Sequence, residues 1–149
     1  MKRLSHLTAL VAILLVGVAA APPADDGFLS YWARFRTAAL SGDMARLATM
    51  TRFPLRAGFD SDQDHPRPIT RAQFPRYFKT ELGCPSIDTG SNLAAIRRRT
   101  RLDPAYDADD GRNATMGRFA FERTGGQWHL TMINYGDSSE YLDRLKGRC

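Results

Sequence analysis

The sequence predicts an α+β fold in which helices near the N-terminus pack on a mainly antiparallel sheet. Apolar residues recur at helical spacing over residues 28–39, and two alternating segments near the C-terminus flank the pair Gly125-Gly126. The first pattern is typical of a core-facing helix and the second of a β-hairpin. The 149 residues, of which 43% are hydrophobic and 25% charged, suit one globular domain.

The first 20 residues have the pattern of a secretory signal peptide. Lys2 and Arg3 precede an apolar run from Leu7 to Ala20, and the run ends in small residues. We predict cleavage near Ala20, which leaves a single exported domain over residues 21–149. A membrane anchor is the alternative, but a bilayer span needs roughly 20 apolar residues and this run is shorter. The expected location is therefore the periplasm or the exterior, without a stable membrane anchor.

The net charge and the cysteine content indicate which partners and which covalent bonds to expect. The whole chain carries a formal charge of +5, and loss of Lys2 and Arg3 with the signal peptide leaves +3. So mild a charge does not favour nucleic acid as a partner. In an exported chain, the two cysteines favour a disulfide between Cys84 and Cys149, with two free thiols as the alternative.

The N-terminal half predicts three helices and one strand. Phe28, Trp32, Phe35 and Ala39 mark one face of a first helix that Gly42 ends, and Asp43 begins a short second helix. Residues 53–59 read as a strand. A third helix follows a capping box over residues 70–73 and continues to residue 82, with its start delayed or kinked by a proline at position 75.

The C-terminal half is dominated by the hairpin. Residues 93–102 fit either a short helix or a strand, whereas residues 118–123 and 127–133 alternate clearly. A two-residue turn at Gly125-Gly126 sets the cross-strand neighbours, which are Phe121 with Leu130, Phe119 with Met132, and Glu122 with His129. A last short helix is expected from residue 138 to a stop at residue 147.

This order of elements resembles the nuclear-transport-factor-like superfamily, also called cystatin-like. The resemblance rests on core and turn segments, namely residues 35–43, 53–55 and 126–130 (FRTAALSGD, FPL and GQWHL). It implies that a curved sheet wraps the helices and leaves a cone-like pocket. The superfamily includes isomerases, dehydratases, ligand binders and association modules, so the resemblance does not decide the function.

The stretch DSDQDHP (residues 60–66) raises the question of a metal site. Asp60, Asp62 and Asp64 match the first three ligand positions of a calcium loop. His65 stands where such a loop needs glycine, and Arg71 stands where it needs a bidentate glutamate. We therefore interpret the stretch as a solvated turn and predict neither a metal nor a cofactor.

Three sets of residues remain as candidate site residues. Glu122 and His129 form a carboxylate–imidazole pair that could act as acid and base, or could be only a pair on a wet sheet face. Four aromatic residues could line an apolar pocket or could simply pack in the core: Tyr31, Trp32, Tyr77 and Tyr135. Arg97, Arg98, Arg99 and Arg101 could hold an anion or form a solvated face.

The sequence does not specify a biochemical activity. We expect an exported envelope protein that binds a small molecule or an envelope protein without catalysis. The alternative is a small isomerase- or dehydratase-type enzyme that uses Glu122 and His129, and association into a homodimer stays open.

Overall fold

The structure is a computed structural model that describes residues 27–59, 68–86 and 90–149. The predicted signal peptide and the stretch DSDQDHP lie outside these residues. Five helices and five strands follow one another along the described chain: α1 (Phe28–Ser41), α2 (Met44–Thr49), β1 (Thr51–Phe59), α3 (Phe74–Gly83), α4 (Asn92–Arg98), β2 (Ala108–Asp109), β3 (Asn113–Met116), β4 (Phe119–Thr124), β5 (Gln127–Tyr135) and α5 (Ser138–Leu145).

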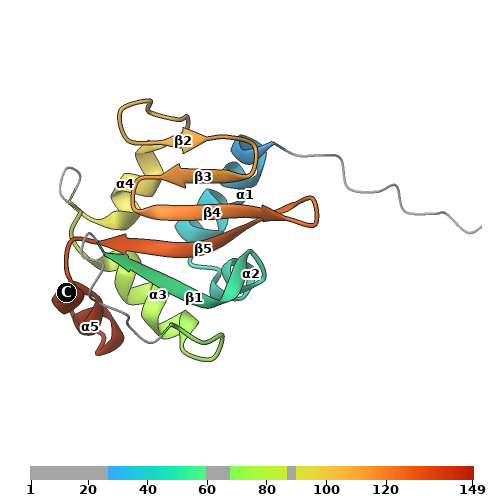
Figure 1. The fold of residues 1–149 in the computed structure, drawn as a ribbon. Helices are drawn as coiled ribbons and strands as arrows, with labels where there is room; N and C mark the ends of the chain where they lie inside the picture. Colours follow the sequence, from blue (N-terminus) through green and yellow to red (C-terminus); the bar gives the residue numbers. More distant parts are fainter. Residues whose placement is uncertain (1–26, 60–67, 87–89) are drawn as a thin grey trace, which may run out of the picture.

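The strands form one open sheet in the order β1-β5-β4-β3-β2. β1 runs parallel to β5, and the other neighbours are antiparallel. Figure 1 shows the sheet face-on, with β1 and β2 at its two edges. The mixed but mainly antiparallel sheet confirms the predicted α+β class.

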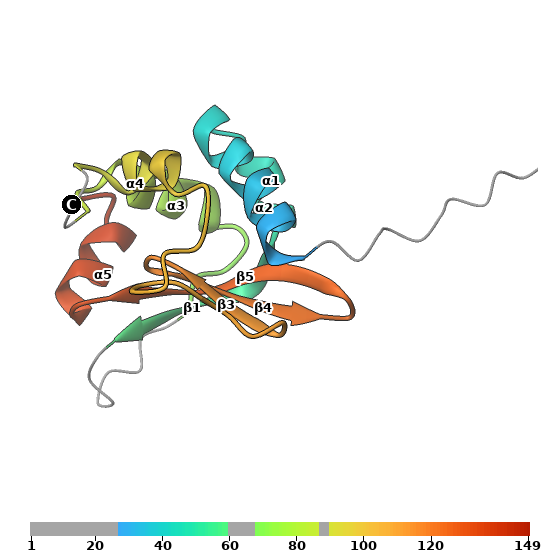
Figure 2. The same cartoon turned by 90° about the horizontal axis from the view of Figure 1, so that it is seen from above.

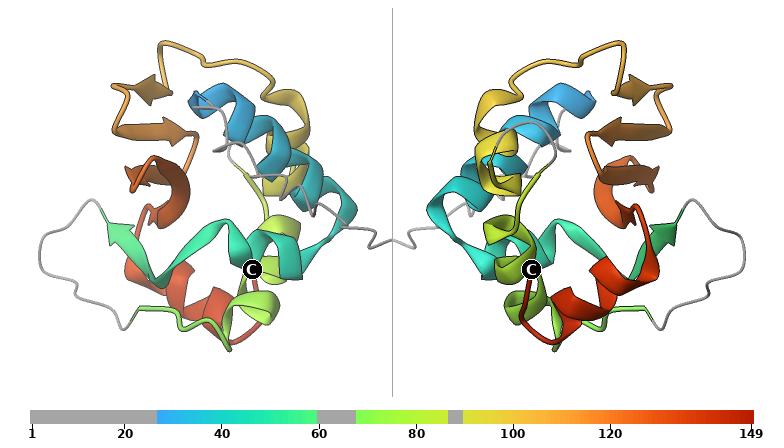
Figure 3. Two further views of the ribbon diagram at one scale, coloured as in Figure 1. Left: turned by 90° about the vertical axis from the view of Figure 1, so that its right-hand side faces the viewer. Right: turned by 90° about the vertical axis from the view of Figure 1, so that its left-hand side faces the viewer.

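The helices lie on one side of the sheet (Figure 2). Seen along the strands, the sheet follows an arc around them (Figure 3), as expected for a curved sheet. Among the described residues, no helix has the length and apolar character that a membrane span requires.

The stripe predicted for α1 faces this core. Phe28, Trp32, Phe35 and Ala39 are all buried, and the Phe35 ring lies 5.5 Å from the Phe121 ring of β4. Such edge-to-face ring contacts stabilise a core beyond the area that they bury. The helix ends as expected at Gly42, whose φ of 69° is the left-handed conformation that glycine adopts without strain.

The hairpin forms with one change of register. Gly125 and Gly126 both have positive φ, and Glu122 lies opposite His129 as predicted. The expected pairing of Phe119 with Met132 is wrong, because the register shifts between Ala120 and Phe121 and Phe119 lies opposite Ile133 instead.

The shift inserts Thr131 as an extra residue in β5, in the manner of a β-bulge. An inserted residue inverts the alternation of side chains beyond it. Ile133 is consequently buried in the core, and Met132 is only partly buried.

Two further predictions concern the helices. The capping box forms, since Thr70 N donates to Gln73 Oε1 at 3.0 Å, but the helix starts only at Phe74, so that Pro75 falls in its first turn. The ambiguous segment is helical over Asn92–Arg98, where the Ser91 hydroxyl caps the helix by accepting from Ala94 N at 3.1 Å.

The predicted disulfide is present. Cys84, just after α3, is bonded to Cys149, the last residue, with 5.3 Å between the Cα atoms. The bond ties the C-terminal segment to the helical layer. α5 also packs there through Tyr141, whose ring lies 6.2 Å from that of Tyr77.

Candidate functional site

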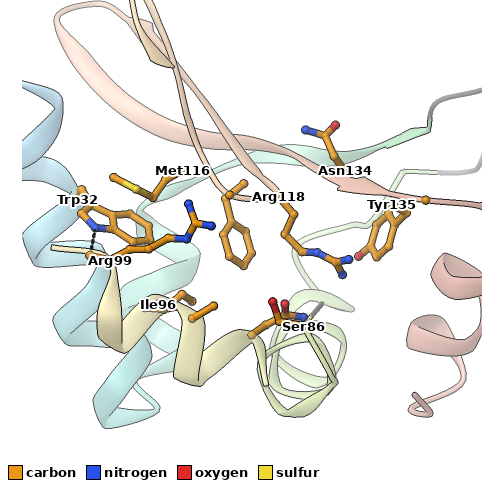
Figure 4. A pocket seen from close by; sticks show the side chains of 13 residues that line it. Trp32, Ser86, Ile96, Arg99, Met116, Arg118, Asn134 and Tyr135 are labelled. Carbon is orange, nitrogen blue, oxygen red and sulfur yellow. Dashed lines mark hydrogen bonds between the residues drawn. The ribbon is translucent and has the colours of Figure 1, made fainter. Parts of the chain in front are cut away.

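A cavity of about 320 Å³ lies between the helical layer and the sheet. Its walls come from α1, α4, the β3–β4 turn and the end of β5 (Figure 4). The volume falls within the range of small-molecule sites. The apolar part of the wall consists of Trp32, Ala95, Ile96, Met116 and Phe119, and the polar part includes Ser86, Asn92, Arg99, Arg118, Asn134 and Tyr135.

A tight turn brings two walls of the cavity together. Met116 of β3 pairs with Phe119 of β4, so only Gly117 and Arg118 connect the strands. Gly117 has a φ of +59°, and a Cβ atom there would lie 3.3 Å from Arg99 Cζ. Glycine is therefore needed both for the turn and for the close approach of the Arg99 guanidinium.

Arg99 is fixed at the end of α4 by its side chain and its backbone. Its Nη1 lies 2.7 Å from Asp107 Oδ1, and the Asp107 side chain is fully buried. The same oxygen accepts a 2.8 Å hydrogen bond from Gly117 N. The Arg99 carbonyl accepts from Trp32 Nε1 at 2.7 Å, which ties the indole to this corner of the cavity.

Arg118 enters the cavity from the sheet. Its Nη1 donates to Glu81 Oε1 and to Glu140 Oε1, both at 2.8 Å. Its guanidinium carbon lies 5.3 Å from the centre of the Tyr135 ring. Figure 4 shows the Arg118 guanidinium directed toward Tyr135 and that of Arg99 extending from the Trp32 side.

Glu81 is the centre of a buried polar network behind the cavity. Its carboxylate also accepts from Asn92 Nδ2 at 2.8 Å, from Tyr135 Oη at 3.2 Å and from Arg144 Nε at 3.2 Å. Two arginines thus face Glu81 and Glu140, and the four charges balance. This network joins α3, α4, α5, β5 and the start of β4.

Burial controls the electrostatics of this network. Loss of water raises the pKa of the Glu81 carboxyl, while the charges of Arg118 and Arg144 oppose that rise. Burial also raises the pKa of the Tyr135 hydroxyl, which keeps it neutral at ordinary pH. The Tyr135 hydroxyl is in hydrogen-bond contact with that of Tyr77.

The four candidate aromatic residues divide into two pairs. Trp32 and Tyr135 line the cavity. Tyr31 is a core residue, because its hydroxyl donates to Met50 O at 2.8 Å and accepts from Leu130 N at 3.1 Å. Tyr77 is also buried, and its hydroxyl contacts that of Tyr135 on the cavity wall.

Glu122 and His129 lie elsewhere. They are neighbours across β4 and β5, but neither lines the cavity. Glu122 Oε1 lies 2.5 Å from Arg56 Nη2 and is part of a groove that Arg52, Phe53 and Thr131 also line. His129 Nδ1 is buried and, within the described part of the chain, has no hydrogen-bond partner.

The fold places the four neighbouring arginines, Arg97, Arg98, Arg99 and Arg101, in different surroundings. Arg99 lines the cavity and also a second hollow beside Tyr106, which Arg98 and Arg101 line as well. The Arg97 carbonyl accepts from Arg36 Nη2 at 2.6 Å, so this segment also holds α1 against α4. Within the run, Arg99 is therefore the residue that lines the cavity.

The sequence did not predict Arg118 and Glu81 as site residues. Glu81 lies three residues after Phe78 and four after Tyr77, on the apolar face of its helix. A charged residue on such a face is buried with partners or marks a site, and this signal was available in the sequence. Its partners come from distant segments and could not be read from spacing.

The described residues contain no group of three His, Cys, Asp or Glu side chains that could hold a metal ion. No protein-family model matches the chain, and no curated protein or solved structure matches it either.

Proposed function

We propose that this chain is an exported, non-catalytic binding domain whose small ligand occupies the cavity beside Trp32, Arg99, Arg118 and Tyr135. The observation that carries the proposal is the chemistry of the wall. It combines a buried apolar surface with a few polar groups that other side chains hold in place. This combination is typical of sites that bind small molecules.

The same wall argues against acid–base catalysis in the cavity. Its described residues include no carboxylate, imidazole or thiol, and the hydroxyl of Tyr135 has a raised pKa. A general acid or base works best when its pKa lies near the working pH. Arginine stays protonated, so Arg99 and Arg118 can bind and orient a ligand but cannot exchange a proton with it.

Tryptophan provides the test of binding. The protein contains only Trp32 and Trp128, so a ¹H–¹⁵N spectrum should show two indole signals. A ligand in the cavity should shift the Trp32 signal, because that indole lines the wall and donates to Arg99 O. A panel of small neutral and charged compounds that leaves Trp32 unmoved throughout would contradict the proposal.

Export is a separate part of the proposal and has its own test. The disulfide is compatible with an oxidising compartment. The protein recovered from outside the cytoplasm should begin at Ala21, and its intact mass should show no free thiol on alkylation without reductant. An N-terminus at Met1 would contradict cleavage near Ala20.

One observation favours a second function, an isomerase- or dehydratase-type enzyme that uses Glu122 and His129. The two residues lie directly opposite each other across β4 and β5, so the carboxylate could orient the imidazole as a general base. His129→Ala should then abolish turnover of a suitable substrate and leave the fold intact. If the sheet face instead pairs two copies, this variant should weaken a dimer in light-scattering measurements.

A further inference from the structure

We propose that the ligand is a small monocarboxylate with an aromatic or branched apolar body, bound through the free edges of Arg99 and Arg118. This inference rests on the proposed function, since it concerns the same cavity. It is drawn from the donors that the two arginines leave unused, from the balance of charge behind the wall, and from the size and character of the space.

Within the described part of the chain, each of the two arginine side chains donates hydrogen bonds from one nitrogen only, Nη1. Arg99 donates from Nη1 to Asp107, and Arg118 donates from Nη1 to Glu81 and Glu140. Within the described residues, Nε and Nη2 of each side chain have no hydrogen-bond acceptor. That edge of a guanidinium carries two parallel N–H groups, which match the two oxygens of a carboxylate.

The guanidinium groups are held in place before a ligand arrives. Arg118 has 18% of its side chain exposed and Arg99 has 27%, while the carboxylates of Glu81 and Asp107 behind them are fully buried. Fixing the donors in advance lowers the conformational cost of binding. A neutral ligand would leave these N–H groups without a charged acceptor, so the wall favours an anion.

The charge balance disfavours a ligand with several negative charges. Arg99 is paired with Asp107, and Arg118 and Arg144 are balanced by Glu81 and Glu140. None of the three acids lines the cavity, so a ligand meets the guanidinium groups directly. A single carboxylate gains two charge-assisted hydrogen bonds, whereas a dianion would bring a second charge close to an already neutral network.

Size and shape define the rest of the ligand. At about 30 Å³ for each water in the liquid, 320 Å³ corresponds to roughly ten water molecules. A ligand of about ten non-hydrogen atoms therefore fits. The apolar side of the wall consists of Trp32, Ile96, Met116 and Phe119, which are nearly fully buried, so a small apolar body suits the space better than a large polar molecule (Figure 4).

Benzoate and benzamide provide a matched pair of probes, because they share a ring and differ mainly in charge. Titration of the oxidised protein with benzoate should shift the Trp32 indole signal in a saturable way and leave the Trp128 signal in place. Benzamide should bind at least about ten-fold more weakly, since it lacks the charge that strengthens hydrogen bonds to arginine.

Arginine variants show which side chains bind the carboxylate of benzoate. Arg99→Gln and Arg118→Gln should each weaken benzoate about ten-fold or more, whereas Arg98→Gln should change its affinity less than about two-fold. Arg98 is the matched control, because it is adjacent in sequence to Arg99 but does not line the cavity. If the glutamine variants do not fold, the lysine variants keep the charge but lose the two-pronged edge, and they too should bind benzoate more weakly.

The failures of the two proposals are distinguishable. Equal binding of benzamide and benzoate at Trp32 would overturn the carboxylate inference and leave the binding function standing. Full benzoate affinity in the Arg99 and Arg118 variants would overturn it as well. If neither probe nor any neutral or charged compound of the wider panel moves the Trp32 signal, the proposed function fails with it.

Discussion

Removal of the disulfide should cost this protein a large part of its stability. Cys84 and Cys149 are 65 residues apart in the sequence. For a closed loop of that length, the loss of chain entropy in the unfolded state corresponds to about 4 kcal/mol at room temperature. Domains of this size are typically stable by about 5–15 kcal/mol, so the bond supplies a considerable fraction.

The assay is urea unfolding of three samples: the oxidised protein, the same protein in reductant, and the Cys149→Ser variant. The last two should agree with each other and lie about 4 kcal/mol below the first. Cys149 is the better position to change, because it is exposed whereas Cys84 is buried.

The loss should also be uneven along the chain. Tyr141 and Arg144 still anchor α5 after reduction, but the four residues beyond it are exposed and lose their covalent tether. Amide exchange should therefore accelerate first over residues 138–149, ahead of the sheet. A loss below about 1 kcal/mol, or equal acceleration in β4 and β5, would refute this account of the bond.

Three further predictions concern single residues. Trp128→Ala should destabilise the fold by about 3–5 kcal/mol in urea unfolding because the side chain is buried, whereas Leu29→Ala on the exposed side of α1 should cost less than about 0.5 kcal/mol. Gly117→Ala should cost about 1–2 kcal/mol at its φ of +59° and displace Arg99, so that the Trp32 indole signal shifts without ligand; an unshifted signal would contradict the close contact. Burial raises the pKa of Glu81 above 4.5, so between 4.5 and that raised value the native state holds a proton that the unfolded state has released, and stability falls as pH rises. The Glu81→Gln variant has no carboxyl group that titrates at this position. The free energy of unfolding of the natural protein minus that of the variant should therefore decline as pH rises through this range, and a constant or rising value would refute the direction of the pKa shift.

The sequence predicted the core better than the site. The stripe of α1 and the hairpin turn are local patterns, and each needs only the spacing of apolar residues or two glycines. The bulge at Thr131 has no such signal. Thr131 continues an alternating run in the sequence, and only the packing of Ile133 against the helical layer makes the shifted register evident.

The strands β2 and β3 were missed for a related reason. β2 has two residues and β3 has four, which is too short for an alternating pattern to stand out. α4 stayed ambiguous because Leu93 and Ile96 fit a helix while the segment as a whole contains few apolar residues. Its N-cap, Ser91, was the clearest available signal.

The candidate site depends on contacts between distant segments. Arg118 meets Glu81 across 37 positions and Arg99 supports Trp32 across 67, and spacing in the sequence does not reveal either contact. Trp32 and Tyr135 could be proposed as pocket residues because large aromatic residues often line apolar sites. Tyr31 and Tyr77 pack in the core instead, and spacing in the sequence does not show which aromatic residues face a cavity.

The parallel pairing of β1 with β5 determines when the fold can form. β5 is the only described strand that joins β1 to the rest of the sheet, and it lies within the last 23 residues of the chain. A growing chain therefore holds its N-terminal helices and β1 without the central strand of their packing surface until β5 is available. Contacts over such separations slow folding and leave apolar surface exposed meanwhile. The interval before β5 is available is therefore the period in which this protein is most exposed to aggregation.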